Sequence, residues 1–143
     1  MAKPLEFEPD LHARIVRHVT QRTLADQEGN PTKAHVLSTP TLVAWFESAV
    51  SQAMLPFVSK TEVILGAHIE IFHKRPTPLG HDVAIEARLM RQEGNKTTWQ
   101  VVAHDEIELV AEGTVVSAVV ELATLNQRLQ PKRKPFFSDE PTP

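Results

Sequence analysis

The chain has 143 residues, of which 41% are hydrophobic and 23% charged, and its formal net charge at pH 7 is -3. This size and composition predict one domain with one core, and the acidic balance argues against nucleic acid or an anionic membrane as a partner. The chain contains no cysteine, which excludes disulfides, a thiol nucleophile and cysteine-based zinc sites. No stretch approaches the roughly 18 apolar residues of a transmembrane helix, and no signal peptide is apparent, so a cytoplasmic location is expected.

The first part of the chain predicts one strand followed by a loop. Residues Leu11–Leu24 are rich in β-branched side chains, which favour strands, although their alternation is imperfect. Residues 25–37 contain Gly29, Asn30 and Pro31, a combination that is typical of loops. The loop leads directly into the next predicted element.

The stretch Ser38–Phe57 predicts a long helix. Apolar residues at spacings of three and four form one broad face, which consists of Leu42, Val43, Phe46, Ala49, Val50, Ala53, Met54 and Phe57. Thr39 and Pro40 predict the N-cap and the first helical position. Glu47 falls on the flank of the apolar face, where a carboxylate is costly unless it is paired or its pKa shifts. We therefore interpret Glu47 as a functional residue.

After the helix, an alternating pattern predicts four long strands in an antiparallel meander. These strands cover Thr61–Lys74, His81–Gln92, Thr97–Glu106 and Glu108–Leu122. One face of the first strand is expected to consist of Val63, Leu65, Ala67, Ile69 and Ile71. Gly66 interrupts this strand and permits a β-bulge or a close backbone approach.

A helix with so wide an apolar face needs a sheet wrapped around it. The order of elements therefore predicts the α+β class and the hotdog fold, in which a curved antiparallel β-sheet encloses one long central helix. We expect a single hotdog domain over residues 1–130 and a flexible C-terminal tail over residues 131–143. One such unit leaves an edge strand open, so we also expect a homodimer that continues the sheet.

Three polar residues are candidates for chemistry. His73 has the strand parity of Ile69 and Ile71, so its ring should point toward the helix, although a lone histidine there is more often structural. Glu47 points inward from the facing helix, and the two predict a carboxylate–imidazole pair in which the carboxylate raises the pKa of His73. Thr39 is the third candidate, because its hydroxyl lies beside free backbone amides that stabilise a developing oxyanion.

Metal binding is not expected. His68 and Glu70 share the strand face opposite to His73, but no third ligand follows at a suitable spacing. We therefore predict no metal site.

The spacing of the three candidates resembles that of a known family. Glu47 follows Thr39 by eight residues and His73 follows Glu47 by twenty-six, as in the fluoroacetyl-CoA thioesterase family of hotdog proteins. The resemblance covers roughly residues 35–130, and its other matching segments are Gly66, HKRPTPLG (His73–Gly80) and WQVVAHDEIELVAEGT (Trp99–Thr114). It implies that Thr39, Glu47 and His73 are catalytic and that the Gly66 backbone lies near the thioester carbonyl.

The resemblance implies an acyl-CoA thioesterase that needs no cofactor, because coenzyme A is part of the substrate. It leaves open whether Glu47 acts as the nucleophile or as the base for a water molecule. Family members often carry a His-x-Arg pair in the last strand, where this chain has Val115 and Ser117. A small or medium acyl group is expected, but the resemblance does not specify which one.

Two other functions fit the same fold. A non-catalytic hotdog dimer that binds an acyl or aromatic small molecule would account for the missing His-x-Arg pair. A hotdog dehydratase has less support, because this chain lacks an Asp and a His at the short spacing that such enzymes use.

Overall fold

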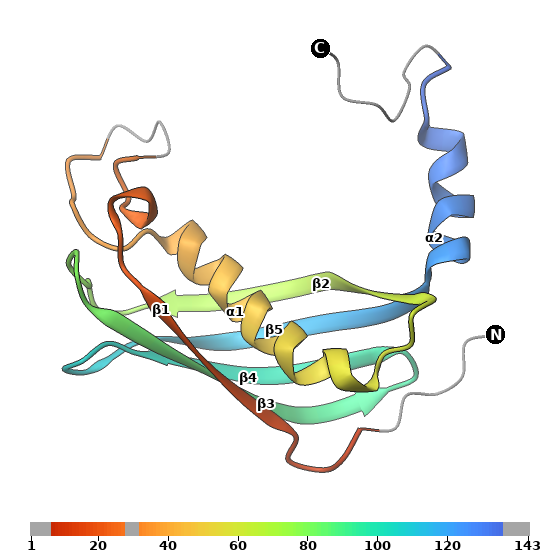
Figure 1. The fold of residues 1–143 in the computed structure, drawn as a ribbon, viewed down its shortest axis with the longest axis horizontal. Coiled ribbons are helices and arrows are strands. Elements are labelled where there is room, and N and C mark those ends of the chain that lie inside the picture. The colour runs from red at the N-terminus through yellow and green to blue at the C-terminus, as the bar shows by residue number, and fades with distance from the viewer. Residues whose placement is uncertain (1–6, 28–31, 136–143) are drawn as a thin grey trace.

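A curved antiparallel sheet of five strands holds the long helix α1 in its hollow in the computed structural model, which describes residues 7–27 and 32–135 (Figure 1). The strands are β1 (His12–His18), β2 (Glu62–His73), β3 (Asp82–Glu93), β4 (Lys96–His104) and β5 (Leu109–Glu121). The helices are α1 (Thr39–Met54) and α2 (Leu122–Leu129), with 3₁₀ turns at Gln21–Thr23, Leu55–Phe57 and Gln130–Lys132. The predicted α+β class and the sheet around a central helix are confirmed.

The strand order is β1-β3-β4-β5-β2, so the predicted meander of four strands is wrong in one connection. β3, β4 and β5 do form a meander, but β2 pairs with β5 and lies at the edge. The chain crosses from β2 to β3 along the end of the sheet, where Leu37 N donates to Thr77 O at 2.9 Å and Gly80 N donates to Val19 O at 3.0 Å. These backbone bonds hold the crossing segment in place without a strand beside it.

The core lies between α1 and the inner face of the sheet. The buried residues of α1 are Leu42, Phe46, Ala49, Val50, Ala53 and Met54. They pack against inner-face residues that include Ile85, Trp99 and Val101. Burial of each large apolar side chain contributes about 1.5–3 kcal/mol, so this contact fixes the position of α1 on the sheet.

Ser38, and not Thr39, is the N-cap of α1, which corrects the prediction. The Ser38 backbone is extended, and its Oγ accepts a hydrogen bond from Thr41 N at 3.1 Å. Thr39 therefore belongs to the first helical turn, with Pro40 behind it, where no N–H is needed. Because Ser38 satisfies the free amide, the hydroxyl of Thr39 is available for a different contact.

A bulge divides β2 into two halves whose side chains alternate differently. The register with β5 shifts between Gly66 and His68. Before the bulge, Ile64 packs against the core and Leu65 is 37% exposed, so the predicted single face is wrong for this half. After the bulge, the predicted parity holds, and Ile69 contacts the core. The extra residue in the bulge is the physical reason, because it reverses the alternation.

The outer edge of β2 has no neighbouring strand among the described residues. On its inner edge the pairing with β5 is very close: a Cβ at Gly113 would overlap the backbone carbonyl oxygen of Glu70. Only glycine fits there, so Gly113 allows the short distance between β2 and β5. The twelve-residue edge carries exposed apolar residues such as Leu65 and Phe72, which is typical of a strand that pairs with another chain.

The short helix α2 was not predicted. It follows β5 directly and projects beyond β2, away from the sheet, at the right of Figure 1. Of the predicted flexible tail, residues 136–143 lie outside the described residues, and Gln130–Lys132 form a 3₁₀ turn.

Candidate functional site

Thr39 and His73 meet where α1 begins and β2 ends. Thr39 Oγ1 lies 2.8 Å from His73 Nδ1, a hydrogen-bond distance, and which atom donates depends on the imidazole tautomer. Ser38 makes this contact possible by capping the helix, and the strand parity after the bulge directs the ring inward. A hydroxyl bonded to an imidazole is an arrangement that can activate the hydroxyl or move a proton.

The environment of His73 favours its neutral form. Burial lowers the pKa of His73, because the charged imidazolium loses hydration, and the backbone of Arg75 counteracts only part of this effect. The predicted increase in pKa is therefore wrong for the isolated chain. Nε2 of His73 is buried and has no hydrogen-bond partner among the described residues. A buried ring nitrogen without a partner is a feature that substrate or water normally satisfies.

Glu47 lies against Gly66, at the middle of β2. A Cβ at Gly66 would lie 2.8 Å from Glu47 Oε2, so only glycine leaves the carboxylate in its present position. Glu47 lines a hollow of about 360 Å³ together with Gly66, Ala67, His68, Ile69 and Val115. Glu47 is exposed in the single chain, and most of the residues that line the hollow belong to the edge strand β2.

The structure does not join Glu47 to His73. Glu47 lies eight residues after Thr39, which places it about 12 Å further along the helix axis. His73 lies seven residues after Gly66, about 20 Å further along an extended strand. No hydrogen bond links the carboxylate to the imidazole in the described part of the chain. One chain therefore carries two separate groups, Thr39 with His73 and Glu47 with Gly66.

Of the two residues that differ from the family pattern, Val115 lines the Glu47 hollow and Ser117 lies beside it on β5. Ser117 pairs with Gly66, and Val115 pairs with Ile69 in the register between β5 and β2. Both are buried, Val115 at 1% exposure and Ser117 at 4%. Apolar Val115 therefore forms the wall of the hollow directly beside the predicted carbonyl-binding backbone.

Two residues that support His73 were missed by the sequence reasoning. Thr77 is fully buried, and its Oγ1 donates to Asp105 Oδ2 at 3.0 Å. Asp105 Oδ1 accepts from the backbone N–H groups of Ile107 and Glu108, which is an Asx-type turn. This network fastens the segment that follows His73 to the β4–β5 loop. Asp105, near the turn between two predicted strands, was the available signal, but the long-range bond to Thr77 has no local sequence pattern.

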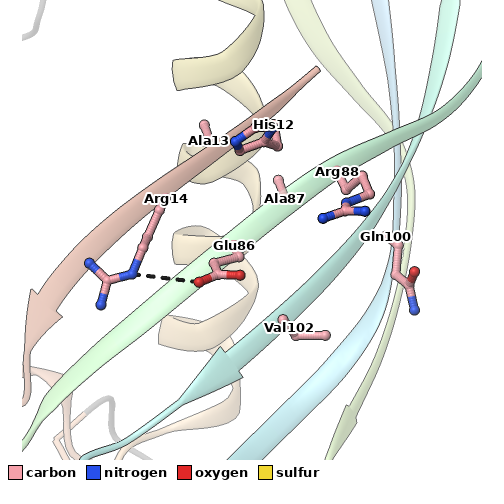
Figure 2. Close-up of a pocket in the computed structure, with 8 residues that line it drawn as sticks. All are labelled: His12, Ala13, Arg14, Glu86, Ala87, Arg88, Gln100 and Val102. Atoms are coloured by element: carbon pink, nitrogen blue, oxygen red, sulfur yellow. Dashed lines mark ion pairs between the residues drawn. The ribbon is translucent and has the colours of Figure 1, made fainter. Parts of the chain in front are cut away.

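A second hollow, of about 460 Å³, lies on the outer face of the sheet (Figure 2). It is formed by side chains of β1, β3 and β4, and Arg14 Nε lies 3.5 Å from Glu86 Oε1 across it. None of the predicted site residues lines it. In the part of the chain that the structure describes, no group of three His, Cys, Asp or Glu residues could hold a metal ion. No described helix is long and apolar enough to cross a membrane.

Comparisons with known proteins identify relatives of this chain. A family model described as fluoroacetyl-CoA-specific thioesterase matches residues 19–123. A fluoroacetyl-CoA thioesterase from Streptantibioticus cattleyicolor is 34% identical over 97 residues, which cover 68% of this chain and 70% of that protein.

Solved structures show the same architecture. A crystal structure of a fluoroacetyl-CoA thioesterase superposes with a TM-score of 0.83 at 26% identity, covering 90% of this chain and 99% of that chain. A Thermus thermophilus thioesterase superfamily member superposes with a TM-score of 0.79 at 25% identity, covering 87% and 94%. A hot-dog-like protein from Thermanaerovibrio acidaminovorans, with a TM-score of 0.82 at 21% identity over 90% and 94%, shows the fold alone.

The Thr77–Asp105 network predicts a pH-dependent stability. Burial by itself would raise the pKa of Asp105, but the hydrogen bonds from Glu108, Ile107 and Thr77 outweigh it, and the pKa is lowered from 3.8. Asp105 therefore stabilises the fold above the pKa that it has in the unfolded chain, and this contribution is lost as pH falls from about 4 through the lower pKa of the folded state.

We expect Asp105→Asn to lower the free energy of unfolding at pH 7 and to approach the wild type as the pH falls below about 4. Urea unfolding of both proteins at a series of pH values measures the difference. A difference that stays constant down to the lowest pH at which both proteins fold would contradict the assigned role of the carboxylate.

Proposed function

The chain belongs to the fluoroacetyl-CoA-specific thioesterase family, and from this membership we propose that it hydrolyses acyl-CoA thioesters. Water adds to the thioester carbonyl, the C–S bond breaks, and the products are a free acid and the thiol of coenzyme A. The proton of the attacking water must leave, and the departing sulfur must receive one. The contact between Thr39 and His73, at 2.8 Å, is the observation that best supports this chemistry.

We assign the proton transfers to His73. Its lowered pKa keeps the imidazole neutral near pH 7, so it can accept a proton from water or from Thr39 and return it to the sulfur. Thr39 orients the ring through Nδ1, which leaves the buried Nε2 for the substrate or a water molecule. Glu47 supplies the carboxylate, as nucleophile or as base, beside the backbone of Gly66.

We further propose a homodimer that forms through the open edge of β2. A long apolar edge strand is unstable in water, and pairing two copies of it continues the sheet. A two-fold axis perpendicular to the sheet makes the two β2 strands antiparallel and keeps both α1 helices on the same face. The hollow beside Glu47 is lined mainly by this edge strand, so a second copy would help to enclose it.

This dimer brings the two groups of catalytic residues closer together. If the axis passes through the middle of β2, between Ala67 and His68, the partner's Gly66 lies opposite Ile69. The partner's Glu47 is then about 10 Å nearer to His73 than the chain's own Glu47 is. We therefore propose that each site combines Thr39 and His73 of one chain with Glu47 of the other.

The acyl group is proposed to be small or medium and apolar. Ile69 and Val115 provide apolar wall in a hollow of about 360 Å³, and Val115 and Ser117 offer no charge to a polar acyl group. The selectivity of the relatives for fluoroacetyl-CoA is therefore not transferred to this chain. Simple ligand binding without catalysis is less favoured, because it leaves the Thr39–His73 contact unexplained. A cytoplasmic location stays a prediction.

Release of free thiol from a panel of acyl-CoA esters tests the function. We expect the wild type to hydrolyse short and medium esters, and Glu47→Gln to fold but to lose about two orders of magnitude or more of activity, as removal of a general base gives. Glu70→Gln is the matched control, because Glu70 is exposed on the outer face of the same strand. No thiol release from any ester, or full activity in Glu47→Gln, would contradict the proposal.

The pKa of His73 predicts the acid side of the pH profile. A neutral imidazole is required, so kcat/KM should be constant at higher pH and fall as pH decreases through a midpoint below 6.5. Initial rates with one ester between pH 5 and 8, at concentrations well below KM, measure this midpoint. His12→Ala, at the start of β1 and outside the Glu47 hollow, should keep the profile. A midpoint above 6.5 would show that His73 is not the titrating group or is not buried during turnover.

A further inference from the structure

The helix α2 carries an apolar stripe that the described residues leave largely uncovered. Leu122, Leu125 and Leu129 lie on one side of the helix, and α2 has no buried residue. Leu122 is 44% exposed and Leu129 is 37% exposed. The start of the helix is joined to the sheet by a hydrogen bond that Leu122 N donates to Thr61 O at 2.8 Å.

An eight-residue helix with few tertiary contacts is only marginally stable in water, because nucleation is costly and isolated helices need about 12–15 residues. The apolar stripe of α2 must therefore be buried for the helix to persist. α2 projects past the free edge of β2, into the space beyond the sheet (Figure 1). This is the space that a second copy occupies if the two chains pair through β2.

Antiparallel pairing of β2 places α2 at a defined part of the partner. With the axis between Ala67 and His68, Glu62 lies opposite the partner's His73. α2 begins beside Thr61, so it starts about one strand spacing from the end of the partner's β2. Its length of about 12 Å is enough to cross the ends of two to three strands. The helix then lies at the sheet end where Thr39 and His73 meet.

The surface at that end is complementary to α2. It carries exposed apolar side chains, Phe72 at 54%, Leu79 at 51% and Ile107 at 79%. Around the end of β2 and the β4–β5 loop, four carboxylates, Asp105, Glu106, Glu108 and Glu112, outnumber the two cations Lys74 and Arg75, which pair with Glu112 and Glu108. Residues 122–135 contain four cations, Arg128, Lys132, Arg133 and Lys134, and no acidic residue. The sheet end and the segment that contains α2 are therefore complementary in both apolar surface and charge.

We propose that α2 of each chain packs on the partner's sheet end that carries Thr39 and His73, so that both chains form the mouth of each site. This inference rests on the proposed pairing through β2. It names a second copy of this chain as the partner that covers the leucine stripe. The site is then incomplete without the partner's helix.

Crosslinking tests the position of α2 directly, because the chain has no cysteine of its own. The variant Lys74→Cys with Arg128→Cys, treated with a short bis-maleimide, should give a covalent dimer on a denaturing gel. The control is Lys60→Cys with Arg128→Cys. Lys60 lies at the other end of β2, beside the start of its own α2, so any link should form within one chain and run as a monomer.

A charge introduced into the leucine stripe tests whether α2 contributes to the partner's site. Leu129→Glu, introduced into the Lys74→Cys and Arg128→Cys variant, should abolish the covalent dimer, and alone it should lower kcat/KM about tenfold. Gln127→Glu adds the same charge to the opposite side of α2 and should match the wild type in both assays. Circular dichroism confirms that each variant is folded.

Failure of this inference is separable from failure of the function. A protein that releases thiol and dimerises but gives no covalent dimer, or gives it equally in both cysteine pairs, overturns the docking of α2 only. A covalent dimer from the Lys74 pair, in a protein that hydrolyses no ester, supports the docking and overturns the thioesterase.

Discussion

The contact of one rigid helix with one strand determines how the site is arranged. α1 is pressed against the inner face of the sheet by its buried apolar residues, so the axial distance between Thr39 and Glu47 cannot change. An extended strand rises about twice as far per residue as a helix does. Thr39 therefore meets the end of β2, whereas Glu47 meets its middle. If Thr39 and Glu47 are both catalytic, as we propose, this spacing separates them within one chain.

Pairing of two chains through the free edge of β2 would shorten the distance between Glu47 and His73. Gly113 allows β5 to approach β2 closely on one side. The other side has no neighbouring strand in the described part of the chain and carries exposed apolar side chains. Pairing of two such edges removes an unstable surface and at the same time brings the partner's carboxylate toward the imidazole. On this account, the pairing of two β2 strands both stabilises the edge and completes the site. The neutral His73, buried with one unpaired nitrogen, is consistent with a site that awaits its remaining components.

The sequence predicted the parts of the fold that depend on regular periodicity. The apolar repeat of α1 and the parity of Ile69 with His73 both hold in the structure, because neither is interrupted between the residues compared. Gly66 marked a possible bulge, but its effect on the first half of β2 required knowing where the extra residue lies. Ser38 and Thr39 are adjacent hydroxyl residues, and the sequence does not show which of them has the extended backbone of an N-cap. The strand order and the Thr77–Asp105 bond depend on long-range packing, which has no local pattern.

Activity of mixed dimers tests the central claim most directly. Glu47→Gln and His73→Ala, each inactive alone, are unfolded together and refolded as an equal mixture. If each site takes Glu47 from one chain and His73 from the other, a mixed dimer contains one intact site, and random pairing restores about a quarter of the wild-type rate per chain. If both residues act within one chain, no mixed dimer contains an intact site, and a mixture that stays inactive although mixed dimers form would contradict the account.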